Sequence, residues 1–100
     1  MPKIYEYLGF VFFFYANEHL PIHVHISIGE FESKIELIYE NGLLKDLIIQ
    51  QVKGRNSLSE NDLKLAMKFV KKYHKGIVDK WTTFFVLNKK VMCERINEKL

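Results

Sequence analysis

The segment from Phe10 to Ser27, FVFFFYANEHLPIHVHIS, constrains the fold more than any other part of this sequence. It begins with an aromatic run, Phe10 to Tyr15, which has the composition of a β-strand and carries no helix-capping residue. Polar residues at 17–19 and Pro21 then interrupt the run and favour a turn followed by extended backbone. Beyond the proline, apolar and polar residues alternate as they do in a strand with one face in a core. The segment therefore predicts two strands joined by a short polar loop.

The second of these strands places two histidines on one face. Its even-numbered residues are apolar, and they alternate with His23, His25 and Ser27. Because residues two apart in a strand point the same way, we expect the apolar side chains to face the core and both imidazoles to lie opposite. Their Cβ atoms would be roughly 6–7 Å apart. Such a pair could bind one metal ion or act on one substrate, and a polar strand face that is solvated or hydrogen-bonded is the simpler interpretation.

His23 and His25 are therefore the candidate functional residues, and two kinds of chemistry suit them. As catalytic residues they could act as general base and general acid in RNA cleavage, because an imidazole pKa of about 6.5 allows both protonation states near neutrality. As metal ligands they need a third donor, for which Glu30, five residues after His25, is our candidate. The other side chains of suitable chemistry are Glu32, His19 and His74. We expect no cofactor, with a divalent metal ion as the alternative.

Three more strands are predicted in the first half of the chain. Ile4 to Tyr7 forms a short first strand, and Phe31 to Tyr39 and Leu43 to Val52 form the last two. Asn41-Gly42 separates these two strands and favours a hairpin, because both residues tolerate positive φ. The cluster Leu47-Ile48-Ile49 does not alternate, so either the fifth strand is covered on both faces or the register we assign to it is wrong.

The second half predicts one long amphipathic helix. Ser59 is the expected N-cap, Leu58 and Leu63 fit a hydrophobic staple, and Asn88 is the expected end. Gly76 would permit a bend, since glycine weakens a helix by about 1 kcal/mol relative to alanine. The side chains expected to face the sheet are Leu63, Ala66, Met67, Val70, Tyr73, His74, Ile77, Trp81, Phe84 and Phe85. Lys90 to Ile96 predicts a short final strand.

These elements predict an α+β fold in which an antiparallel meander of about five strands packs against the helix. A length of 100 residues with 48% hydrophobic composition predicts a single domain over residues 1–100. No apolar run approaches the roughly 20 residues that cross a bilayer, and the N-terminus lacks the pattern of a signal peptide. Cys93 is the single cysteine, so no internal disulfide can form. We therefore expect a cytoplasmic protein that does not contact membranes.

Charge is distributed unevenly along the chain. Residues 1–50 hold three lysines against seven acidic residues, a net charge of −4, whereas residues 51–100 hold twelve basic against five acidic residues, a net charge of +7. One flank of the predicted helix carries Lys64, Lys68, Lys71, Lys72 and Lys75. This lysine flank could contact nucleic acid or an acidic partner protein, and a solvated helix surface is the simpler interpretation.

The aromatic run and the histidine strand also carry a resemblance to a known family. FFFYANE followed by P-x-H-V-H-I, with a short strand beginning MPKIYEY before them, resembles the bacterial and phage family catalogued as domain of unknown function 4160. The helix AMKFVKKYHKGIVDKWTTFF is similar to that family's helix, so the likeness covers most of residues 1–86. The chain differs in having Ile22 where many relatives carry a second proline, and in continuing past the usual C-terminus. Members often lie beside a gene for a second small domain, and such pairs have been suggested to be toxin–antitoxin modules.

Three functions are consistent with these observations. The first is a protein-interaction module of a two-gene, toxin–antitoxin-like pair, whose partner is a small protein from a neighbouring gene or a second copy of the chain. The doubly apolar aromatic strand favours it, because both faces of that strand must be covered. The alternative is an RNA-directed toxin or ribonuclease in which His23 and His25 catalyse and the lysine flank contacts phosphate. The third is a metal-binding protein built on the His-x-His strand. The sequence leaves open whether the protein is an enzyme.

Overall fold

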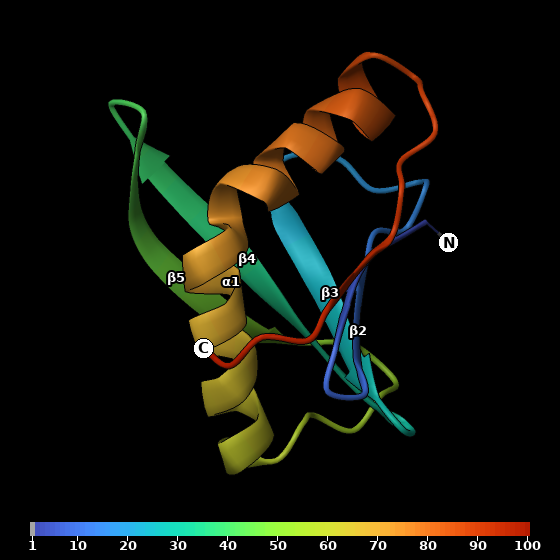
Figure 1. Cartoon of the computed structure of the whole chain (residues 1–100), viewed down its shortest axis with the longest axis vertical. Helices are drawn as coiled ribbons and strands as arrows, with labels where there is room; N and C mark the ends of the chain where they lie inside the picture. Colours follow the sequence, from blue (N-terminus) through green and yellow to red (C-terminus); the bar gives the residue numbers. More distant parts are fainter. Residues whose placement is uncertain (1) are drawn as a thin grey trace.

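Turns divide the first half of the chain into five consecutive strands (Figure 1). The structure is a computed structural model that describes residues 2–100. Both residues of the Asn41-Gly42 turn have positive φ, 55° and 80°, as the hairpin prediction requires. The strands are β1 (Lys3–Tyr7), β2 (Phe10–Phe13), β3 (His23–Ile28), β4 (Phe31–Glu40) and β5 (Leu43–Gln51).

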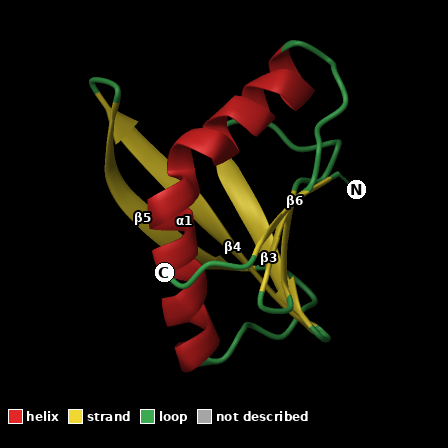
Figure 2. Ribbon diagram, viewed as in Figure 1, coloured by secondary structure: helices red, strands yellow, loops and turns green. Residues whose placement is uncertain are grey.

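The five strands form an antiparallel meander, and a sixth strand extends it at the far edge. The order across the sheet is β5-β4-β3-β2-β1-β6, with β6 (Glu94–Ile96) paired parallel to β1. Figure 2 shows β6 returning to the N-terminal part of the chain. The predicted α+β class and the final strand are confirmed, although β6 is shorter than the predicted segment from Lys90 to Ile96.

One long helix, α1 (Glu60–Trp81), lies across one face of the sheet (Figures 1 and 2). Ser59 is its N-cap, and the Ser59 hydroxyl accepts a hydrogen bond of 3.2 Å from the Asp62 amide, as predicted. The α-helix ends earlier than the expected stop, and a π-helical turn, η1 (Thr82–Val86), follows it. The helix is kinked at Tyr73, where φ is −104° and ψ is 16°. Within residues 2–100, no helix combines the length and the apolar character needed to cross a bilayer.

The kink lies at Tyr73 and not at Gly76, which meets a different requirement. A Cβ atom at position 76 would overlap the Tyr5 hydroxyl and lie 3.3 Å from the Tyr5 ring carbon Cζ. Tyr5 is buried on β1 and packs edge-on against Phe69 of the helix. Gly76 therefore lets the helix approach the first strand closely.

Phe69 lies at the centre of the core between α1 and the sheet. Its side chain is 0% exposed, and its ring stacks on Phe12 at a centroid distance of 4.4 Å and on Tyr7 at 5.2 Å. The expected helix stripe omitted this residue, although positions 66, 69, 70, 73 and 77 follow helical spacing. The buried helix residues are Ala66, Phe69, Val70, Ile77 and Trp81, and those of the sheet include Phe10, Phe12, Val24, Ile26, Ile35 and Leu37.

The opposite face of the sheet is covered in part by the chain itself. Phe13 points to this face and is only 1% exposed, because Tyr15 and His25 pack against it at centroid distances of 5.2 and 5.5 Å. The second face of the aromatic strand therefore needs no partner to bury it. Of the two alternatives for β5, coverage on both faces is wrong, since Ile48 and Ile49 are 41% and 44% exposed.

Candidate metal centre

His23 and His25 are buried, although they lie on the face of β3 opposite Val24 and Ile26. Their exposed fractions are 7% and 3%, so neither is a solvated surface residue. Val24 and Ile26, which alternate with them, are fully buried on the helix side, as the period of the strand predicts. The residues that follow β2, from Tyr15 onward, return across the histidine face and shield it.

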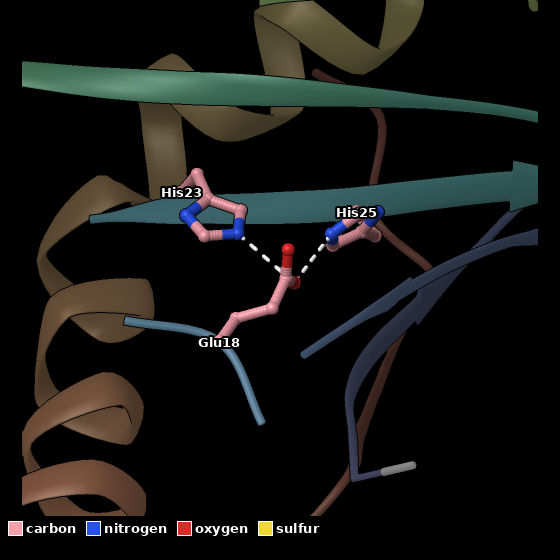
Figure 3. Close-up of side chains that lie close together, drawn as sticks. All are labelled: Glu18, His23 and His25. Atoms are coloured by element: carbon pink, nitrogen blue, oxygen red, sulfur yellow. Dashed lines mark hydrogen bonds and ion pairs between the residues drawn. The ribbon is translucent and has the colours of Figure 1, made fainter. Parts of the chain in front are cut away.

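Glu18, on the loop between β2 and β3, joins the two histidines. Its Oε1 atom lies 2.6 Å from His25 Nε2 and 3.0 Å from His23 Nε2. Figure 3 shows the Glu18 carboxylate pointing between the two imidazole rings. One carboxylate oxygen is therefore shared by two ring nitrogens.

The other nitrogen of each ring lies against a second oxygen acceptor. His25 Nδ1 lies 3.0 Å from Glu32 Oε2, and His23 Nδ1 lies 2.8 Å from the Pro21 carbonyl oxygen. A carbonyl oxygen can only accept, so His23 Nδ1 carries the hydrogen and donates it to Pro21. His25 has a carboxylate oxygen at each nitrogen, and we assign its hydrogen to Nδ1, toward the buried Glu32. In a neutral imidazole the remaining nitrogen, Nε2, is then an acceptor with a lone pair. Both lone pairs face Glu18.

Glu32 and its neighbours hold the His25 ring in place. Glu32 is buried on β4, where the Tyr15 hydroxyl donates to it at 3.0 Å and Arg55 Nη1 lies 3.6 Å from its Oε1. Burial raises the pKa of the Tyr15 hydroxyl, and the hydrogen bond to Glu32 raises it further. Tyr15 also packs edge-on against His25 at 4.5 Å, and Phe13 stacks on that ring at 5.5 Å. These contacts restrict the ring to one orientation.

Burial and the contacts among the three side chains together determine the charge state of the group. It holds the pKa of His25 below its usual value, despite the opposing influence of Glu18. Burial would by itself raise the pKa of Glu18, but the hydrogen bonds and charges of the two histidines outweigh it and lower that pKa. At neutral pH we therefore expect an ionised Glu18 beside a neutral His25.

This arrangement leaves lone pairs opposed to one another. His23 Nε2 is shielded from solvent and makes no aligned hydrogen bond, although Glu18 Oε1 is 3.0 Å away. Such a buried nitrogen is costly unless a cation or donor satisfies it. A cation placed among the three atoms would satisfy all of them.

The three atoms are spaced suitably for a small metal ion. One donor atom from each of Glu18, His23 and His25 lies within 4.8 Å of the others. Zinc bonds of about 2.0–2.2 Å in a tetrahedral site require ligand atoms roughly 3.3 Å apart, so the 2.6 Å separation of Glu18 Oε1 and His25 Nε2 would have to lengthen by less than about 1 Å. Across residues 2–100 this group has three members, which leaves a fourth tetrahedral position open.

A protein-family model matches the part of the chain that contains this group. The family model described as "Domain of unknown function (DUF4160)" matches residues 9–82. The chain belongs to this family. The match includes all three residues of the group and also Glu32. No curated protein and no solved structure matches the chain.

The fold of this chain places some of the other predicted ligand candidates near this group and others away from it. Glu30, the expected third ligand, lies in the exposed turn between β3 and β4, and Glu18 occupies the position beside both histidines. Glu32 contacts His25 through Nδ1, on the far side of the ring from Glu18. His74 lies on α1, with its Nδ1 2.5 Å from the Tyr39 hydroxyl. His19 lines two pockets beside the group.

The lysine flank of this DUF4160 chain is distant from the histidines. Lys64, Lys68, Lys71, Lys72 and Lys75 are all exposed on α1, and Lys72 pairs with Glu98 at 3.3 Å. Trp81, farther along the helix, packs edge-on against His23 at 5.4 Å. At 1.5 Å per residue the lysines lie about 9–26 Å from Trp81 along the helix axis. The lysines nearest the group line its pockets instead, namely Lys34, Lys89 and Lys90.

Proposed function

We propose that this protein binds a divalent transition-metal ion through His23, His25 and Glu18, with zinc as the best chemical match. Imidazole nitrogens and a carboxylate oxygen are zinc ligands, and hard cations such as Mg²⁺ and Ca²⁺ prefer all-oxygen sites. The observation that carries the proposal is that both Nε2 atoms lie against one Glu18 oxygen, while each Nδ1 lies against another oxygen acceptor. Metal-ligating histidines are held in this way, with the second ring nitrogen donating to a carboxylate or a backbone carbonyl.

A proton could replace the metal by charging a buried ring or by protonating Glu18, and the contacts with the two histidines oppose the second by lowering the pKa of Glu18. If His25 were protonated, its Nε2 would donate to Glu18, and the 2.6 Å contact would become an ordinary charged hydrogen bond. Burial of the ring opposes this, because it disfavours the charged form. A single proton on His25 would also leave His23 Nε2 without a partner. One metal ion satisfies both histidines together.

The open fourth position supports a hydrolytic role for the metal. Three protein ligands and one water are typical of catalytic zinc sites, where the metal lowers the pKa of the bound water to about 7. A polar pocket of about 330 Å³ borders the group, and Glu18, His23, Lys34 and Gln50 are among its lining residues. We propose that small polar substrates reach the metal from this side. The ribonuclease alternative has less support, because both histidines are buried and the lysine flank is remote.

Zinc titration of the full chain tests the proposal. We expect calorimetry of chelator-treated protein to show one equivalent of Zn²⁺ bound, and we expect EDTA to remove it. Glu18→Gln should abolish high-affinity binding, because a neutral amide oxygen is a poor zinc ligand beside two imidazoles. Glu30→Gln is the matched control and should bind as the wild type does. A wild-type protein that binds no zinc, or a Glu18→Gln protein that binds it unchanged, would contradict the proposal.

Partner binding at the β5 edge is the second candidate function. β5 is an edge strand, and it exposes Ile48 and Ile49 together with a row of backbone groups that no strand of residues 2–100 covers on that side. Such edges bind other chains by strand addition. A small protein encoded by a neighbouring gene is the candidate partner for a two-gene module, and a second copy of the chain is the alternative.

Co-expression with the neighbouring gene product tests this second candidate. We expect the two proteins to co-elute in size-exclusion chromatography, and we expect Ile48→Lys with Ile49→Lys to abolish the complex, since lysine at a strand edge blocks pairing. Leu65→Lys, an exposed apolar residue on α1, is the control and should leave the complex intact. Light scattering of the protein alone detects self-association. Monomers in both experiments would contradict this function.

A further inference from the structure

A larger pocket lies on another side of Glu18, between the β2–β3 loop and the end of the helix. It has a volume of about 710 Å³, and Glu18 belongs to its wall as well as to that of the polar pocket. Figure 1 shows the loop after β2 passing near the C-terminal end of the helix. The metal group therefore lies next to a second cavity, whose chemistry is different.

The floor of this pocket is a cluster of aromatic rings. Trp81 and Phe85 are 4.2 Å apart between ring centroids, and Phe84 packs edge-on against Phe85 at 4.8 Å. The π-helical turn η1 carries both phenylalanines. Short π-helical turns are frequent at functional sites, and this one points two half-buried rings at the cavity. The floor suits a flat apolar group.

The rim of the pocket carries positive charge. Lys89 and Lys90 line it, and within residues 2–100 neither ammonium group lies within ion-pair distance of a carboxylate. Of the described residues that line the pocket, Glu18 alone is acidic, and its carboxylate is engaged by the two histidines. The charge that remains for a ligand is therefore cationic.

We propose that this pocket binds a small organic anion with a flat apolar body, whose carboxylate or phosphate is held by Lys89 and Lys90. The volume falls in the range of small-molecule sites, about 300–1,000 Å³, which are mostly apolar with a few placed polar groups. Binding itself requires no metal. Glu18 belongs to the walls of both pockets, so the bound anion would lie next to the metal group, a consequence that rests on the proposed function.

Trp81 provides the measurement, because it is the single tryptophan of the chain and lies in the pocket floor. The full chain is titrated with phenylacetate, phenyl phosphate and neutral benzyl alcohol, each with and without zinc, while Trp81 fluorescence is recorded. We expect a saturable change with at least one of the anions, and an affinity about tenfold above that for benzyl alcohol. The phenylacetate and phenyl phosphate series distinguish a carboxylate ligand from a phosphate ligand.

Two double lysine variants distinguish anion binding in the pocket from nonspecific attraction to the positively charged surface. Lys89→Gln with Lys90→Gln should lower the affinity for the anion about tenfold, while Lys68→Gln with Lys71→Gln on the exposed helix should leave it unchanged. Anions that bind no better than benzyl alcohol, or equal loss in both double variants, would overturn the proposal. Anion binding in a protein that takes up no zinc would contradict the metal centre alone. Zinc binding without anion binding would contradict the pocket alone.

Discussion

Replacing Phe69 with alanine is expected to lower the free energy of unfolding by about 3–5 kcal/mol, the cost of truncating a fully buried phenylalanine. The ring is 0% exposed and touches aromatic rings from β1, β2 and the helix, so its removal leaves a cavity among rigid neighbours. That loss is a large share of the roughly 5–15 kcal/mol that stabilises a domain. Urea denaturation followed by circular dichroism measures it.

Leu65→Ala is the matched control for this change. Leu65 lies on the same helix and is 37% exposed, so its truncation should cost far less, about 1 kcal/mol or below. If Phe69→Ala unfolded at the same urea concentration as Leu65→Ala, Phe69 would not be the centre of the core.

Replacing His25 with alanine is expected to lower the affinity for zinc at least 100-fold, because one of three ligands is lost. Glu32→Gln should have a smaller effect, about 10–100-fold, since Glu32 does not touch the metal and acts only by holding His25 through Nδ1. Competition with a chelator of known affinity measures both losses. The graded order distinguishes a ligand from a positioning residue.

Two controls test whether these variants lose zinc affinity merely because they are misfolded. Circular dichroism checks that each protein is folded, and Glu32→Asp, which keeps a carboxylate, should restore part of the affinity that Glu32→Gln loses. Equal zinc affinity in wild type and His25→Ala would show that the ion binds elsewhere. A Glu32→Gln protein indistinguishable from wild type would remove the positioning role.

Much of the fold could be predicted from short-range signals. The Asn41-Gly42 hairpin, the alternation in β3 and the Ser59 cap are each set within a few residues, and the structure confirms all three. The parallel pairing of β6 with β1 could not be predicted, because Tyr5 and Glu94 lie at opposite ends of the chain and no turn connects them. Long-range pairing is decided by tertiary packing, which a local pattern does not contain.

The candidate site was predictable only in part, for a similar reason. The His-x-His spacing indicated that two imidazoles share a face, but Glu18 reaches them only because its loop folds back over β3. A polar loop has no hydrophobic periodicity from which its path over β3 could be predicted. Glu32 could have been placed, since a two-residue turn at Gly29-Glu30 pairs Ser27 with Glu32 and so places Glu32 diagonal to His25. The expected ligand Glu30 lies in that turn.

Long-range ¹H–¹⁵N NMR of the four histidines before and after addition of zinc tests the metal centre most directly. We predict that zinc shifts the Nε2 resonances of His23 and His25, that both rings keep their hydrogen on Nδ1, and that His19 and His74 are unaffected. This pattern follows from the oxygen acceptors at both Nδ1 atoms and from the shared contact with Glu18. Two results would contradict the account. One is a zinc-induced shift at His19 or His74 with none at His23 and His25. The other is a hydrogen on Nε2 of His23 or His25 before zinc is added.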